Sequence, residues 1–70
     1  MNRTTSDLAE LSSVRSQLEE LTARVTSIAG RYQETPDSAV ATDLFEAERQ
    51  LAAAGRVIER ALASLRELEG

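Results

Sequence analysis

The sequence predicts an all-α fold, an antiparallel coiled-coil hairpin of two helices, and three observations support this prediction. Hydrophobic residues recur at alternating spacings of three and four along two long stretches of the 70-residue chain. A turn signal around Pro36 separates these stretches, which otherwise contain mostly residues that favour helices. A spacing of 3.5 residues, kept over about four heptads on each side of a turn, is typical of a left-handed coiled coil.

The first helix is expected over residues 6–33, after a disordered segment of residues 1–5. Ser6 and Asp7 form a helix-start signal, because their side-chain oxygens can accept the unpaired backbone N–H groups of a first turn. The hydrophobic pattern continues through Tyr32, which predicts that the helix ends at the next residue.

The turn is expected at residues 34–36 and the second helix over residues 37–69, within a single domain. Proline disfavours helical geometry for the residue before it, and its missing N–H suits the first position of a helix. Thr35 is therefore predicted to be the N-cap of the second helix. Asp37 then lies favourably at the positive end of the helix dipole.

The predicted core of the hairpin occupies heptad positions a and d of both helices. Position a holds Leu11, Leu18, Val25 and Tyr32, then Leu44, Leu51, Ile58 and Leu65. Position d holds Val14, Leu21 and Ile28, then Val40, Ala47, Ala54, Ala61 and Leu68. A turn at Pro36 places residues whose numbers sum to about 72 opposite each other, so that a meets d in every layer. Leu18 is then expected to face Ala54.

A second strip of small or apolar residues flanks this seam and exceeds what a lone hairpin needs. The strip comprises Leu8, Ala41, Phe45, Ala52, Gly55 and Leu62. A lone hairpin would leave the strip in water, whereas a second hairpin packed on it would complete a four-helix bundle. Gly55 favours this interpretation, because a mid-helix glycine costs roughly 1 kcal/mol relative to alanine and suits a close approach of another backbone. We therefore expect a homodimer, with another helical protein as the alternative partner.

The composition argues against catalysis and metal binding. The chain has no cysteine and no histidine, so the commonest metal ligand and the commonest general base are both absent. Neighbouring carboxylates such as Glu19 and Glu20 fall at solvent-side heptad positions and are interpreted as a solvated helix surface. We expect no enzymatic activity, no metal and no cofactor.

The charge pattern argues against nucleic acid and membrane as partners. The formal net charge is −4, which disfavours binding to phosphate-rich surfaces. Arg49, Arg56 and Arg60 share the outer face of the second helix, but Glu46 and Glu59 lie among them. These side chains are expected to support the helix as ion pairs, and a phosphate- or nucleotide-binding regulator is the alternative.

The source and compartment can also be predicted. All eight basic residues are arginine and alanine is abundant, which indicates a bacterial protein from a GC-rich genome. We expect neither a signal peptide nor a transmembrane span, and hence a cytoplasmic protein. The leading interpretation is a small adaptor or regulator. An export-linked hairpin of type VII-like secretion is an alternative, although Ala29-Gly30-Arg31-Tyr32 stands here where that class carries Trp-x-Gly, so the sequence assigns no family.

Overall fold

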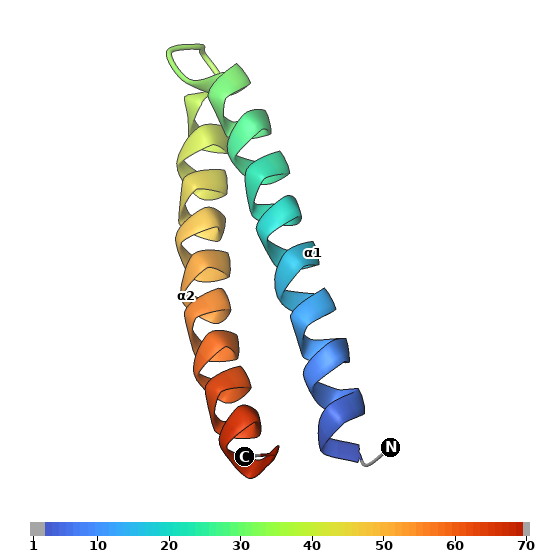
Figure 1. Ribbon diagram of the computed structural model, residues 1–70. Coiled ribbons are helices and arrows are strands. Elements are labelled where there is room, and N and C mark those ends of the chain that lie inside the picture. The colour runs from blue at the N-terminus through green and yellow to red at the C-terminus, as the bar shows by residue number, and fades with distance from the viewer. Residues whose placement is uncertain (1–2, 70) are drawn as a thin grey trace.

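Two long helices joined by a short turn make up the molecule, of which the computed structural model describes residues 3–69. Helix α1 spans Arg3–Tyr32 and helix α2 spans Ser38–Glu69. The helices run antiparallel and pack against each other, with the turn at one end and the outer ends of both helices at the other (Figure 1). The Cα trace is 54 Å long, 16 Å wide and 11 Å thick. The predicted all-α hairpin is confirmed.

The first helix begins earlier than expected. The sequence predicted a disordered segment of residues 1–5, but residues 3–5 are helical. Residues 1 and 2 lie outside the described residues. The hydroxyl of Thr5 donates a hydrogen bond to the carboxylate of Glu69, at the end of α2. This contact across the open end of the hairpin gives the first turn of α1 a tertiary partner, which local start signals cannot reveal.

Thr35 organises the turn, as the sequence predicts. Its Oγ1 accepts a hydrogen bond from the backbone N–H of Asp37 at 3.1 Å, the capping contact expected of Thr35, and regular α2 begins one residue later, at Ser38. The same hydroxyl donates to the carbonyl of Tyr32 at 2.6 Å and so closes the end of α1. Glu34, just before Thr35, adopts a φ of 58°, the left-handed conformation that often follows a helix. The turn itself spans residues 33–37, one residue longer on each side than expected.

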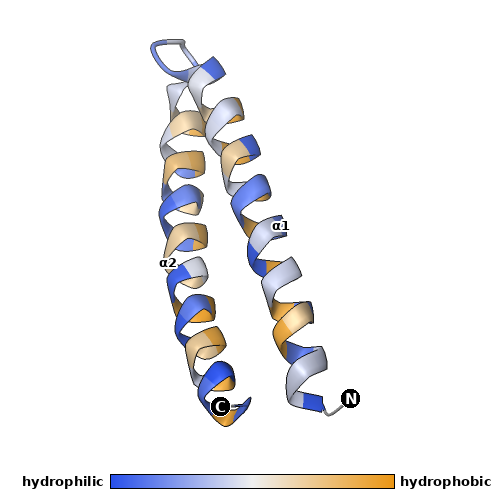
Figure 2. Cartoon of the chain, viewed as in Figure 1, coloured by the Kyte–Doolittle hydropathy of each residue, from blue (hydrophilic) through white to orange (hydrophobic). Residues whose placement is uncertain are grey.

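The packing seam between the helices differs from the predicted one. The fully buried residues are Ala29 of α1 with Ala41 and Leu62 of α2, and all three occupy heptad position e. The position a residues from Leu11 to Val25 and from Leu44 to Leu65 are half-buried, in agreement with the prediction. The hairpin is therefore closed by positions a and e instead of a and d. Hydrophobic and hydrophilic residues alternate along both helices, consistent with packing on one side (Figure 2).

The predicted core residues at position d require a correction. Most of them lie on the surface rather than between the helices: Val14, Leu21, Ile28, Val40, Ala54, Ala61 and Leu68 are exposed, as is Tyr32 at the last position a, and Ala47 is half-buried. The physical reason is that Ala29, Ala41 and Gly55 at position e leave room for the backbones to approach on that side, while Leu62 at the same position is buried there. Heptad spacing identifies the apolar stripe of each helix but not which of its two flanks turns toward the neighbour.

The register changes together with the seam. The Cδ2 atom of Leu18 lies 3.6 Å from the position that a Cβ on Gly55 would occupy, whereas the predicted register placed Leu18 opposite Ala54. Arg15 and Glu59 approach to 3.8 Å between Nη1 and Oε1, which fixes a second level of the hairpin. Relative to the predicted register, the Leu18 contact is shifted by one residue along α2 and the Arg15 contact by two, and α2 is rotated from position d to position e.

Candidate protein-interaction surface

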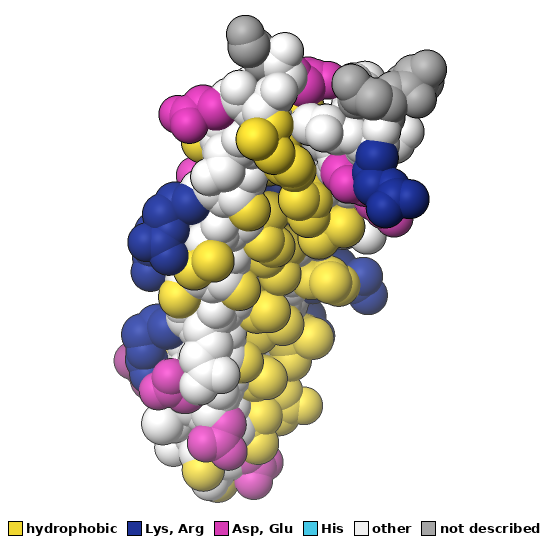
Figure 3. Space-filling view, turned by 90° about the horizontal axis from the view of Figure 1, so that it is seen from below, with side chains coloured by type: hydrophobic (Ala, Val, Ile, Leu, Met, Phe, Trp, Pro, Cys, Tyr) yellow, Lys and Arg dark blue, Asp and Glu magenta, His cyan; other side chains and the backbone are white. Residues whose placement is uncertain are grey.

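The broad face of the hairpin that carries position d is apolar and exposed. Equivalent heptad positions of two antiparallel helices lie on the same side of the pair. We call this surface the open face, and it comprises Val14, Leu21 and Ile28 of α1 with Val40, Ala47, Ala54, Ala61 and Leu68 of α2. Leu21 is 47% exposed and Leu68 is 75% exposed. Hydrophobic side chains form a continuous band in the space-filling view, with charged side chains at its margins (Figure 3).

The open face carries large side chains on α1, which form a ridge, and mostly alanines on α2, which leave a recess. The observed contacts between Arg15 and Glu59 and between Thr26 and Glu48 define which residues share a level. To within one residue of these levels, the large side chains of α1 lie beside alanines of α2: Val14 beside Ala61, Leu21 beside Ala54, and Ile28 beside Ala47. Large residues therefore project from α1 while α2 is recessed, and the surface fits a partner with the opposite relief.

Charged residues mark the margins of the open face near the turn. Arg31 lies at the outer margin of α1 and Asp43 at the outer margin of α2, both at heptad position g. Within residues 3–69, neither side chain takes part in an ion pair. Arg24, Ser27, Ile28 and Arg31 line a shallow hollow of about 290 Å³. An acidic side chain would fit between these two arginines.

The strip that the sequence predicted as the dimer interface lies mostly inside the hairpin. Ala41 and Leu62 are buried against α1, and Leu8 and Gly55 are half-buried between the helices. Of the other members, Phe45 is half-buried and Ala52 is exposed. The two predicted sets thus exchange roles, since most of the expected interface closes the hairpin and much of the expected core is exposed.

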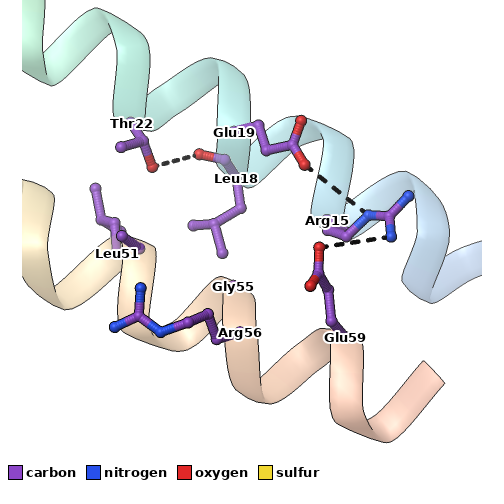
Figure 4. Close-up of a pocket in the computed structure, with 9 residues that line it drawn as sticks. Arg15, Leu18, Glu19, Thr22, Leu51, Gly55, Arg56 and Glu59 are labelled. Carbon is purple, nitrogen blue, oxygen red and sulfur yellow. Dashed lines mark hydrogen bonds and ion pairs between the residues drawn. The ribbon is translucent and has the colours of Figure 1, made fainter. Parts of the chain in front are cut away.

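A cavity of about 240 Å³ lies on the other broad face, where α1 and α2 meet near mid-length (Figure 4). It is lined by Arg15, Leu18, Glu19, Thr22, Leu51, Ala52, Gly55, Arg56 and Glu59. Leu18 points from α1 toward the α2 backbone at Gly55, so the floor is apolar. The rim is charged.

The charge of Arg15 on this rim is compensated by two carboxylates of the same hairpin. The guanidinium of Arg15 lies 4.0 Å from the Glu19 carboxylate and 3.8 Å from that of Glu59 on the opposite helix. The hydroxyl of Thr22 donates to the carbonyl of Leu18 at 2.7 Å and so is not directed at a ligand. Arg56 extends along α2 toward Leu51, away from Arg15, and the two arginines do not converge on a common point (Figure 4). The cavity therefore does not bring together the positive side chains that binding an anion would require.

The arginine stripe on the outer face of α2 is interleaved with acids, as expected. Arg49 donates to Oε1 of Glu46 at 2.7 Å, and Gln50 donates to Oε2 of the same carboxylate at 3.2 Å. The hydrogen bond and the charge of Arg49, with the Gln50 bond, hold the pKa of the Glu46 carboxyl below its usual value. Arg56 and Arg60 line a shallow surface that also includes Glu59. A phosphate group would meet a carboxylate at each step along this stripe.

Besides the contact between Thr5 and Glu69, two polar contacts between the helices were missed by the sequence reasoning. Thr26 donates a hydrogen bond to the Glu48 carboxylate, and Arg15 pairs with Glu59. The predicted register placed these residues on the solvent side, so no partner was expected for them. The small residues at position e were the available signal, since they already distinguished that flank from an ordinary solvated surface.

The chain has no match that would supply a function. Comparison with protein-family models found none, and comparisons with curated proteins and with solved structures also found none. Neither helix, over residues 3–69, combines the length and the apolar character that crossing a bilayer requires. In the same part of the chain, no three acidic side chains gather where they could hold a metal ion.

Proposed function

We propose that the protein is a non-enzymatic protein–protein interaction module, a small adaptor or regulator that acts as a homodimer through its open face. The observation that carries the proposal is the apolar band formed by position d of both helices, typified by Leu21 on α1 and Ala54 on α2. Exposed apolar surface of this extent is rare on monomeric proteins and marks association sites. Two such faces packed together would complete a four-helix bundle.

The small core of the hairpin supports the same proposal. Leu62 is the one large side chain among residues 3–69 that is fully buried. Chains of this size rarely gain enough stability from one small core and often depend on oligomerisation. In the proposed dimer, the half-buried residues of position a, such as Leu18 and Leu51, would become fully buried together with the open face. Folding and association would then be coupled.

A second copy of this chain is the occupant that the surface fits best. The ridge of α1 and the recess of α2 are complementary to each other, so the face is complementary to itself. The broad side of the hairpin measures 54 by 16 Å, on the order of the ~800 Å² per partner that a stable interface buries. The margins add opposite charges, Arg31 on one helix and Asp43 on the other.

Two neighbouring alanines provide a matched test. Ala53 and Ala54 are both exposed on α2, but only Ala54 belongs to the open face. Ala54→Glu would place a charge in the apolar interface and should give a monomer, whereas Ala53→Glu should leave the dimer intact. Sedimentation equilibrium measures both. A wild type that stays monomeric at high concentration, or two variants that behave alike, would overturn the proposal.

A further inference from the structure

We propose that the two copies lie side by side in the same direction, with both turns at one end and α1 of each copy packed on α2 of the other. This inference rests on the proposed homodimer and specifies its geometry. Two symmetric arrangements bring the open faces together. In the first, the two-fold axis runs parallel to the helices, and in the second it crosses them, so that the turns lie at opposite ends.

The relief of the open face favours the parallel axis. That axis places α1 over the partner's α2 at the same level, so Leu21 would enter the recess at the partner's Ala54. Val14 and Ile28 would likewise face the partner's Ala61 and the partner's Ala47. Large side chains then meet small ones in each layer, which allows uniform packing along the bundle.

The crossing axis pairs like with like. It places α1 over the partner's α1, so that leucine, valine and isoleucine side chains meet one another, while the alanines of α2 meet alanines. The two helix pairs would then need different separations across one interface.

Charges at the margins favour the same choice. With the parallel axis, Arg31 lies at the level of the partner's Asp43, and symmetry creates this pair twice. The hollow between Arg24 and Arg31 would receive that carboxylate at the edge of the interface. With the crossing axis, Arg31 would instead approach the partner's Arg3, which carries the same charge. Rim pairs of this kind contribute modestly to affinity but select between orientations.

The end near the turn supplies a third observation. Tyr32 is 37% exposed and Val40 is 41% exposed, so the open face stays apolar up to the turn. The parallel axis brings the two copies of this apolar end together. The crossing axis would place it against the beginning of α1, where Thr4 and Asp7 occupy positions a and d.

Distance measurements between spin labels test the direction. The chain contains no cysteine, so a cysteine introduced by Gln33→Cys in the exposed turn provides a unique attachment site. In the proposed dimer, two labels at residue 33 lie a bundle width apart, well below the 54 Å length of the hairpin. A mixture of Gln33→Cys copies and Glu67→Cys copies, labelled separately, should show a long distance between residues 33 and 67. A long distance between the two residue-33 labels with a short mixed distance would overturn the inference.

Exchanging the two charges tests the proposed pair between Arg31 and the partner's Asp43 independently. Arg31→Glu and Asp43→Arg should each weaken dimerisation several-fold, and the double variant should restore it. The two residues lie at opposite margins of one hairpin, so such a rescue would arise between copies. Sedimentation equilibrium distinguishes a failure of the proposed homodimer from a failure of its side-by-side arrangement. A monomeric wild type refutes the proposed function, whereas a dimer without rescue and with distant turns refutes only the side-by-side arrangement.

Discussion

Leu18 of α1 packs directly over Gly55 of α2, with its Cδ2 atom 3.6 Å from the position that a β-carbon on residue 55 would occupy. This separation is an ordinary van der Waals contact, so the helices approach closely at this level without excluding a methyl group. The contact lies on the flank of the hairpin that carries position e. Gly55 therefore faces the other helix of its own hairpin, whereas the sequence pointed to a second copy at this residue.

Gly55→Ala should stabilise the protein by about 1 kcal/mol, because alanine restricts the unfolded chain and favours the helix. Thermal melts of the variant and the wild type measure the change. Gly30→Ala is the matched control, since no atom lies within 4 Å of its added methyl group and the same gain is expected. Loss of stability in Gly55→Ala, together with a gain in Gly30→Ala, would show that the helices are closer together at Gly55 than described here.

Leu62→Ala should cost about 2–5 kcal/mol of unfolding free energy, the usual cost of emptying a fully buried leucine site. Leu62 is 0% exposed, because it packs between α2 and α1. Val57→Ala in the same helix should cost far less, because Val57 is 53% exposed and does not belong to the open face. Urea titrations of both variants provide the comparison. Equal losses would contradict the seam through position e.

Glu34→Gly should raise stability by about 1 kcal/mol, because a left-handed backbone is strained in residues with a β-carbon and free in glycine. Glu34 adopts this conformation with a φ of 58°. Gln33→Gly is the control, since positive φ among the described non-glycine residues occurs at Glu34 alone, and this change should reduce stability. The reverse order of the two variants in thermal melts would exclude the described turn geometry.

Acidification should weaken the contact between Glu46 and Arg49. The pKa of the Glu46 carboxyl is lowered in the folded protein, first by its hydrogen bonds from Arg49 and Gln50 and then by the charge of Arg49. A lowered folded-state pKa contributes stability above the unfolded-state pKa, and this contribution is lost as pH falls through the folded-state value. An NMR titration should therefore show Glu46 titrating below its usual pKa, with a higher value in Arg49→Gln. An unchanged value in that variant would contradict the assigned cause.

The sequence was sufficient to predict the two helices, their antiparallel order and the cap at Thr35. Each of these depends on local chemistry: the spacing of apolar residues along one helix, and the hydroxyl before Pro36 that accepts the N–H of Asp37. Residues at position a were also placed correctly, because Leu18 and Leu51 lie at the centre of the apolar stripe whichever flank is buried.

The choice of flank could not be predicted in the same way. Position d of α2 is apolar throughout, and position e holds Ala41, Gly55 and Leu62 beside two glutamates, so that at mid-helix Ala54 and Gly55 are nearly equivalent by composition. Which one faces α1 depends on how closely two backbones approach and on contacts such as that between Arg15 and Glu59. These are properties of the pair of helices and not of either helix alone. The candidate interaction surface was predicted wrongly for the same reason, because it was defined as the apolar residues outside the predicted core.

The dependence of the melting temperature on protein concentration tests the proposed coupling of folding and dimerisation most directly. A dimer that gains stability from its open face should melt at a higher temperature as wild-type concentration increases 100-fold. Ala54→Glu should melt lower and at a temperature independent of concentration, while Ala53→Glu should behave as the wild type. A wild-type melting temperature that stays constant over this range, equal to that of Ala54→Glu, would contradict the account.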